Sequence, residues 1–159
     1  MPDTSETPKL KVEDSIKIDD PEKLDDAGDA KLILIAEDDP FISRMYQIKL
    51  EGAGLRVLVR NNGRDAFETI KAEHPSLAIL DINMPELSGL EVLSALQSDG
   101  FDFTSMPVIV LTNSSELSDR NKAQSYGAEY LVKAELTPRQ VLNIIDAKLN
   151  IPGPQAGNA

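Results

Sequence analysis

Five short runs of branched apolar residues alternate with helical patterns between Lys31 and Asn150, and this alternation limits the fold more than any other feature. Short runs of this kind are typical of strands that are buried on both faces. Buried strands that alternate strictly with helices form a parallel sheet with helices on both of its faces, an α/β architecture. The five runs cover residues 32–36, 55–59, 77–81, 107–111 and 130–132.

The first helical pattern has a clear start and an apolar side. We expect Asp39 to be the N-cap of a helix that begins at Pro40, because Pro is favoured at the first helical position. Gly52 and Gly54 are expected to end this helix. The apolar positions at helical spacing, which predict the face turned to the core, are Phe41, Met45, Ile48 and Leu50.

Two later helices have boundary signals of their own. Ser115 can cap a helix that reaches Tyr126, and Gly127 is expected to stop it. Thr137 and Gln140 have the spacing of a capping box at the start of the last helix.

Length and charge limit the kind of protein that this chain can be. The chain of 159 residues suits one domain, expected over residues 31–150, with a disordered acidic N-terminal arm over residues 1–30 and a flexible tail over residues 151–159. A net charge of −11 argues against direct binding to nucleic acid. The chain has no cysteine, no signal-peptide pattern and no apolar stretch of membrane-spanning length, so we expect a cytoplasmic protein without membrane association.

Polar or charged residues end or directly follow four of the five runs. They are Glu37 with Asp38, Asp81, Thr112 and Lys133. The carboxyl ends of parallel strands meet at one edge of the sheet, which is where sites form in such folds. We therefore expect these side chains to lie together at that edge.

The residue types at this edge predict a particular chemistry. Three carboxylates at one place repel each other, and a divalent cation such as Mg²⁺, which prefers oxygen ligands, relieves the repulsion. A lysine and a hydroxyl beside them would suit a phosphoryl group. In such a pocket an aspartate can act as a nucleophile and form an acyl phosphate.

Several motifs follow one another in order along residues 31–150. They are Ile35-Ala36-Glu37-Asp38-Asp39, Leu80-Asp81-Ile82-Asn83-Met84-Pro85, Ser88-Gly89, Val110-Leu111-Thr112 and Tyr130-Leu131-Val132-Lys133. Together these motifs resemble the receiver domain of two-component response regulators, of the stand-alone, chemotaxis-receiver-like kind. The resemblance implies a doubly wound, flavodoxin-like (βα)₅ fold whose parallel sheet has the strand order 2-1-3-4-5.

The resemblance implies a phosphoacceptor and a metal site. Asp81 matches the phosphoacceptor, and Glu37 and Asp38 match the acidic pair that holds Mg²⁺ together with Asp81 and the backbone carbonyl of Asn83. Asp39 is interpreted as a helix cap and is left out of the site.

The resemblance also implies a switch. Thr112 matches the hydroxyl that follows the phosphoryl group, Tyr130 the aromatic residue that swings inward with it, and Lys133 the lysine that contacts the phosphate. Taken alone, Thr112 could be an ordinary strand-end residue and Tyr130 could serve only in packing. The single histidine, His74, is interpreted as a bystander in a surface turn.

Two positions depart from the family pattern. The family usually has proline after the lysine, joined by a cis peptide bond, whereas this chain has Ala134. A cis bond without proline costs about 2.5–4 kcal/mol, so the bond is either strained or trans. The residue after the switch hydroxyl is usually small, and Asn113 could narrow access to Asp81.

The leading hypothesis is a phosphorylation-controlled switch, not an enzyme except toward its own phosphoryl group. The implied partners are a histidine kinase or phosphotransfer protein and a downstream protein at residues 116–126, 130–132 and 138–149, with a phosphorylation-dependent homodimer left open. Nothing after Asn150 could form an output domain, hence the expectation of a stand-alone receiver.

A degenerate receiver that only binds partners is one alternative. The other is an aspartyl-nucleophile phosphatase, against which Asn83 counts because those enzymes need an acid at that position.

Overall fold

The computed structural model describes residues 30–149, so the expected N-terminal arm and C-terminal tail lie outside the described residues. Its five strands form one parallel sheet in the order β3-β2-β4-β5-β6. Counted along the described chain this is the predicted order 2-1-3-4-5, and the flavodoxin-like prediction is confirmed. The strands are β2 (Leu32–Ala36), β3 (Arg56–Arg60), β4 (Leu77–Leu80), β5 (Val108–Thr112) and β6 (Glu129–Val132).

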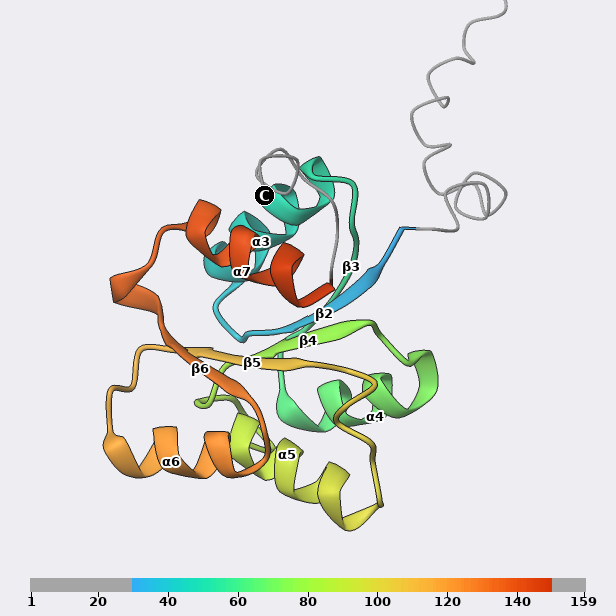
Figure 1. Ribbon diagram of the computed structural model, residues 1–159, viewed down its shortest axis with the longest axis vertical. Coiled ribbons are helices and arrows are strands. Elements are labelled where there is room, and N and C mark those ends of the chain that lie inside the picture. Colours follow the sequence, from blue (N-terminus) through green and yellow to red (C-terminus); the bar gives the residue numbers. More distant parts are fainter. Residues whose placement is uncertain (1–29, 150–159) are drawn as a thin grey trace, which may run out of the picture. The chain divides into compact units, whose positions relative to one another are not determined.

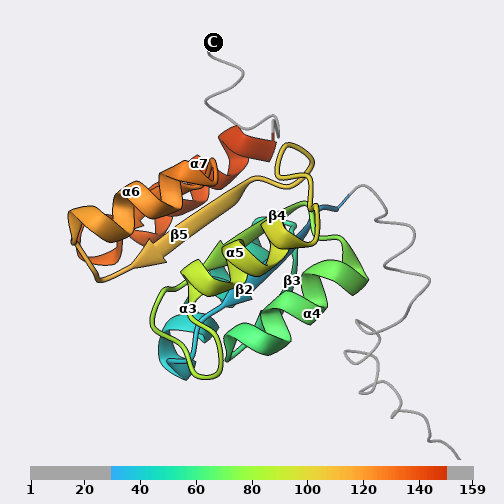
Figure 2. The ribbon, with the colours of Figure 1, turned by 90° about the horizontal axis from the view of Figure 1, so that it is seen from below.

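Helices cover both faces of the sheet, as Figures 1 and 2 show. Helices α3 and α7 lie on one face, and α4, α5 and α6 lie on the other. The described helices are α3 (Pro40–Gly52), α4 (Gly63–Glu73), α5 (Gly89–Ser98), α6 (Leu117–Ser125) and α7 (Pro138–Leu149), with a 3₁₀ turn η2 (Lys133–Glu135) before α7. Within residues 30–149, every helix is too short or too polar to cross a bilayer.

Each central strand serves two cores because its side chains alternate between the faces. In β2, Ile33 and Ile35 pack with the residues of α3 and α7, whereas Leu34 and Ala36 pack with those of α4 and α5. All four of these residues are buried. This two-sided burial explains why the strands read as continuous apolar runs rather than as alternating patterns.

The predicted apolar side of α3 is wrong at three of its four positions. Phe41, Met45 and Ile48 are exposed by 86, 43 and 56%, whereas Leu50 is buried as predicted, together with Tyr46, which was not predicted. The Asp39 side chain accepts hydrogen bonds from the first helical N–H groups and so fixes where the helix begins. The buried residues Ser43, Tyr46 and Leu50 follow one another at helical spacings of three and four, a side of the helix that hydrophobicity alone does not mark.

The other helix boundaries agree in part with the sequence. Asp39 is confirmed as the N-cap of α3, and the capping box of Thr137 and Gln140 is confirmed by two reciprocal hydrogen bonds. The prediction that Ser115 caps α6 is wrong, because the N-cap is Glu116 and its side chain makes no capping hydrogen bond. Ser114 takes part of that role, since its hydroxyl accepts a hydrogen bond from the Glu116 N–H group.

Helix α5 begins against the end of β4 because its first residue is glycine. The Gly89 N–H group donates to the Ile82 carbonyl, and a Cβ atom on Gly89 would lie 2.2 Å from the backbone oxygen of Asp81. No side chain fits at that distance. The glycine therefore brings the first turn of α5 directly behind Asp81.

We expect Gly89→Ala to lower the free energy of unfolding by about 1–3 kcal/mol, because the methyl group forces the backbone at Asp81 to move. Urea denaturation measures the change. Gly52→Ala is the matched control, since a Cβ atom at Gly52 has no atom within 4 Å and its φ is unstrained. Equal effects of the two substitutions would show that the close approach at Gly89 is not tight.

Candidate functional site

Three carboxylates lie together at the carboxyl edge of the sheet. Glu37 and Asp38 follow β2, and Asp81 follows β4, the neighbouring strand. One oxygen of each side chain lies within 4.8 Å of the other two. Glu37 and Asp81 are buried and Asp38 is exposed, so the cluster opens to solvent on the side of Asp38.

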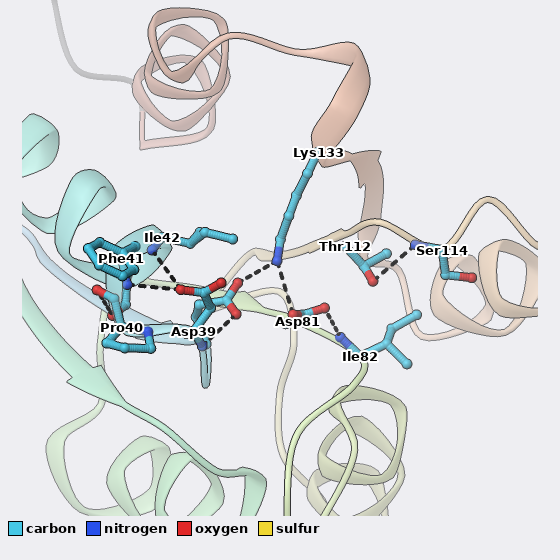
Figure 3. Close-up of polar contacts among 11 residues, drawn as sticks. Asp39, Pro40, Phe41, Ile42, Asp81, Ile82, Thr112, Ser114 and Lys133 are labelled. Atoms are coloured by element: carbon cyan, nitrogen blue, oxygen red, sulfur yellow. Dashed lines mark hydrogen bonds and ion pairs between the residues drawn. The ribbon is translucent and has the colours of Figure 1, made fainter.

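Lys133 brings a positive charge to this cluster from the end of β6. Its Nζ atom lies 2.5 Å from Oε1 of Glu37 and 3.0 Å from Oδ2 of Asp81, as Figure 3 shows for Asp81. The lysine side chain is only 12% exposed. One ammonium group thus bridges two buried carboxylates that come from different strands.

The other oxygens of the two buried carboxylates accept backbone N–H groups. Oε2 of Glu37 accepts from Asp39 at 3.0 Å, and Oδ1 of Asp81 accepts from Ile82 at 2.7 Å. These bonds fix both side chains in place. Among the described residues, no hydrogen bond or ion pair engages the Asp38 carboxylate, which leaves that group open toward solvent.

Burial and pairing shift two pKa values in this site. Burial raises the pKa of Glu37, and the neighbouring Asp81 charge adds to the rise, while hydrogen bonds from Lys133 and the Asp39 N–H group oppose it. Burial alone would lower the pKa of Lys133, but its hydrogen bonds to Glu37 and Asp81 and their charges outweigh this, and the pKa is raised. The lysine is therefore held in its charged form.

The donor set fits a hard divalent cation. Three carboxylate oxygens lie close together here, and the only ammonium group beside them is that of Lys133 among the described residues. Carboxylate oxygens are the ligands that Mg²⁺ and Ca²⁺ prefer. Asn83 lies exposed in the loop after Asp81, and its backbone carbonyl accepts no hydrogen bond from the described residues. The residues that could hold a metal are thus Asp38, Asp81 and the Asn83 carbonyl, with Glu37 beside them.

A pocket of about 310 Å³ adjoins the cluster on its open side. The residues that line it are Asp38, Asn61, Asn62, Pro85 and Glu86. Asn61, Asn62 and Glu86 were not predicted to lie at the site, because they stand in loops that carry only ordinary turn residues. The pocket leaves room for a hydrated ion or a small polar group next to Asp38.

Thr112 lies at the end of β5, between the strands that carry Asp81 and Lys133. It is fully buried, and its Oγ1 atom accepts a hydrogen bond from the Ser114 N–H group at 3.3 Å (Figure 3). Tyr130 in β6 is also buried, at 5% exposure, and its hydroxyl donates to the Ser114 carbonyl at 2.7 Å. Both switch residues of the sequence analysis therefore contact Ser114.

Ser114 was not predicted as a functional residue. Its contact with Tyr130 joins residues 16 apart in the sequence, and it follows from the pairing of β5 with β6 rather than from any local spacing. In the sequence, the only indication of a role for Ser114 is that it lies two residues after Thr112.

The two departures from the family pattern leave the site intact. Residues 30–149 contain no cis peptide bond, so the bond between Lys133 and Ala134 is trans, and Lys133 Nζ still reaches both carboxylates. Asn113 is exposed. His74 is exposed as well, in a left-handed C-cap of α4.

Comparison with known protein families gives one match over most of the domain. The family model of the response regulator receiver domain matches residues 33–146. The solved structures that resemble this one include a CheY-like response regulator receiver domain protein from Methanospirillum hungatei JF-1, with a TM-score of 0.68 and 28% sequence identity. The match covers 76% of this chain and 94% of that chain.

Two transcriptional regulators of Bacillus subtilis (strain 168) are among the similar curated proteins. The alkaline phosphatase synthesis transcriptional regulatory protein PhoP is 31% identical over 111 residues, 70% of this chain and 45% of that protein. The uncharacterized transcriptional regulatory protein YkoG is 34% identical over 121 residues, 76% of this chain and 52% of that protein. The chain thus spans about half the length of these relatives, and the expectation of a stand-alone receiver stays a prediction.

Without Mg²⁺, we expect Lys133→Met to lower the free energy of unfolding at pH 7 by about 3 kcal/mol, because two buried carboxylates lose their counter-charge. The loss should be smaller near pH 5. The pKa of Glu37 is already raised in the folded protein, and removing the lysine raises it further. The folded state then holds the proton more tightly than the unfolded state, so stability falls as pH rises through this window.

Thermal and urea unfolding at both pH values, in the presence of a chelator, measure this effect. Lys148→Met is the matched control, because Lys148 pairs with Glu129 at 2.8 Å on the surface, where an ion pair contributes at most about 1 kcal/mol. A Lys133→Met variant as stable as the wild type at pH 7 would contradict the role assigned to the bridge.

Proposed function

We propose that this chain, which belongs to the response regulator receiver domain family, is a two-component switch that accepts a phosphoryl group on Asp81. The observation that carries the proposal is the position of Asp81, whose two oxygens are held by Lys133 and the Ile82 N–H group inside a cluster of carboxylates. A nucleophile held in this way is oriented for attack, and a nearby ammonium group can stabilise the charge of the incoming phosphoryl oxygens.

The phosphodonor in this proposal is a phosphohistidine of a kinase or phosphotransfer protein. An oxygen of Asp81 forms a bond to phosphorus, the phosphorus–nitrogen bond breaks, and the electron pair returns to the imidazole, which takes up a proton. The products are an acyl phosphate on Asp81 and a neutral histidine. The protein catalyses only this gain and the later hydrolytic loss of its own phosphoryl group, and it acts on no other substrate.

Mg²⁺ is the proposed cofactor. When bound by Asp38, Asp81 and the Asn83 carbonyl, with Glu37 beside it, it would offset the repulsion between the carboxylates and the phosphoryl oxygens. Among these residues, Asp38 has the most accessible side chain and no competing contact within the described residues, which makes it the most direct test of metal binding.

The proposed output is a protein–protein contact at residues 116–126, 130–132 and 138–149. Thr112 and Tyr130 both contact Ser114, two residues before this region begins, which supports a physical connection to the site. Direct nucleic-acid binding is not part of the proposal, because a net charge of −11 repels phosphates. A cytoplasmic location, expected from the sequence, belongs to the same proposal.

We expect one phosphoryl group to be added when the protein is incubated with acetyl phosphate and Mg²⁺, and intact-mass spectrometry measures it. Asp81→Asn should show no addition, because an amide is not a nucleophile. Asp119→Asn is the control, since it removes a carboxylate outside the site. A wild-type protein that gains no mass under these conditions would contradict the phosphoacceptor proposal and favour a receiver that only binds partners.

We also expect Mg²⁺ to raise the melting temperature, because a ligand that binds only the folded state stabilises it. Asp38→Ala should lose most of this response, and its metal-free form should be as stable as the wild type or more so, because one source of carboxylate repulsion is gone. Asp39→Asn should keep the response, since asparagine also caps helices and Asp39 is not a proposed ligand. Differential scanning fluorimetry over a Mg²⁺ series distinguishes these outcomes, and an undiminished response in Asp38→Ala would reject the ligand assignment.

A further inference from the structure

Helix α6 is attached to the domain differently from its neighbour α5. Helix α5 buries three large apolar side chains, Val92, Leu93 and Leu96, whereas the only buried residue of α6 is Ala123. Leu117, at the start of α6, is 67% exposed. Burial of one methyl group contributes little to holding a helix in place, so other contacts must fix α6.

Two polar contacts from neighbouring residues of α6 meet the rest of the domain. The Asp119 carboxylate accepts a hydrogen bond from the Ser114 hydroxyl at 2.7 Å. The Arg120 guanidinium lies over the ring of Tyr130, 5.0 Å from the ring centroid. Such a contact is stronger when it is shielded from water, and here the tyrosine is buried and the arginine half-buried.

These two contacts converge on one residue pair. The Tyr130 hydroxyl donates to the Ser114 carbonyl, so the partner of Arg120 and the partner of Asp119 are themselves bonded. The Ser114 N–H group donates to Thr112. Ser114 therefore uses its N–H, carbonyl and hydroxyl groups to join the end of β5, the ring in β6 and the first turn of α6.

We propose that Asp119 and Arg120 form a polar clasp that holds α6 against β6, with Arg120 as the positioning residue that keeps Tyr130 in its buried position. The role of the clasp in signalling rests on the proposed function, in which Thr112 is the group that responds to phosphorylation. The clasp itself rests only on the contacts described above.

The clasp determines how readily α6 moves. A change at Thr112 can move α6 only through contacts that differ before and after that change. In this proposal the hydrogen bonds of Ser114 are those contacts. Arg120 stabilises the buried position of Tyr130 independently of Thr112. Because the resemblance assigns an inward Tyr130 to the phosphorylated form, the strength of the Arg120 contact sets how far that position is favoured before Thr112 contributes.

The test compares wild type with Arg120→Ala, both without phosphodonor and without Mg²⁺. Amide hydrogen exchange in α6 should become about threefold to thirtyfold faster, the range expected for loss of one such contact, while exchange in α5 and α7 stays unchanged. The aromatic NMR signals of Tyr130 should shift toward those of an exposed tyrosine. Alanine is the better helix former, so a change in intrinsic propensity would slow exchange rather than accelerate it.

Three further variants make the test specific. Lys122→Ala removes an exposed cation from the same helix and should leave both signals unchanged. Arg120→Lys keeps the charge and should restore part of the protection. In a Tyr130→Leu background, Arg120→Ala should have little additional effect, because the pair that it breaks is already gone.

Unchanged α6 exchange in Arg120→Ala, or equal acceleration by Lys122→Ala, would overturn the proposal, as would unmoved Tyr130 signals. Unfolding of the Arg120→Ala variant does not remove the test, because Arg120→Lys and the double-variant cycle report on the same contact. The outcome is separate from the proposed function, since no phosphoryl group or metal is present. A chain that gains no mass from acetyl phosphate can still show the clasp, and a phosphorylated chain can lack it.

Discussion

The site depends on the ion pairs that the ammonium group of Lys133 makes with two carboxylates. This ammonium group lies between Glu37 and Asp81 and so ties the carboxyl ends of β2, β4 and β6 to one another. The balance is incomplete, because one positive charge faces three carboxylates when Asp38 is included. The sheet edge therefore keeps an excess of negative charge, which a bound cation or a proton would reduce.

The sequence predicts the sheet well because its signals are strong and local. Buried parallel strands must be apolar on both faces, and the polar residues that follow Ala36, Leu80 and Val132 stand out against such runs. It predicts the buried side of α3 poorly, since hydrophobic spacing included Phe41 and Ile48, which are exposed, and correctly included only Leu50.

The network around Ser114 could not be read from the sequence for a different reason. Serine in a loop is commonplace, and its three polar groups acquire partners only when β5 and β6 pair and α6 folds back beside them. The positions of Glu37, Asp81 and Lys133 were predictable because each directly follows a strand. The position of Arg120 was not, because its partner Tyr130 is brought near by the tertiary fold alone.

The span of chain between the bridged residues links chemistry to the completeness of folding. Lys133 lies 96 residues after Glu37 and 52 residues after Asp81, and it comes from the last strand along the chain, at the edge of the sheet. An intermediate that lacks β6 contains the carboxylates but has no ammonium group among them. The bridged arrangement therefore requires the last strand along the chain to have paired with the rest of the sheet.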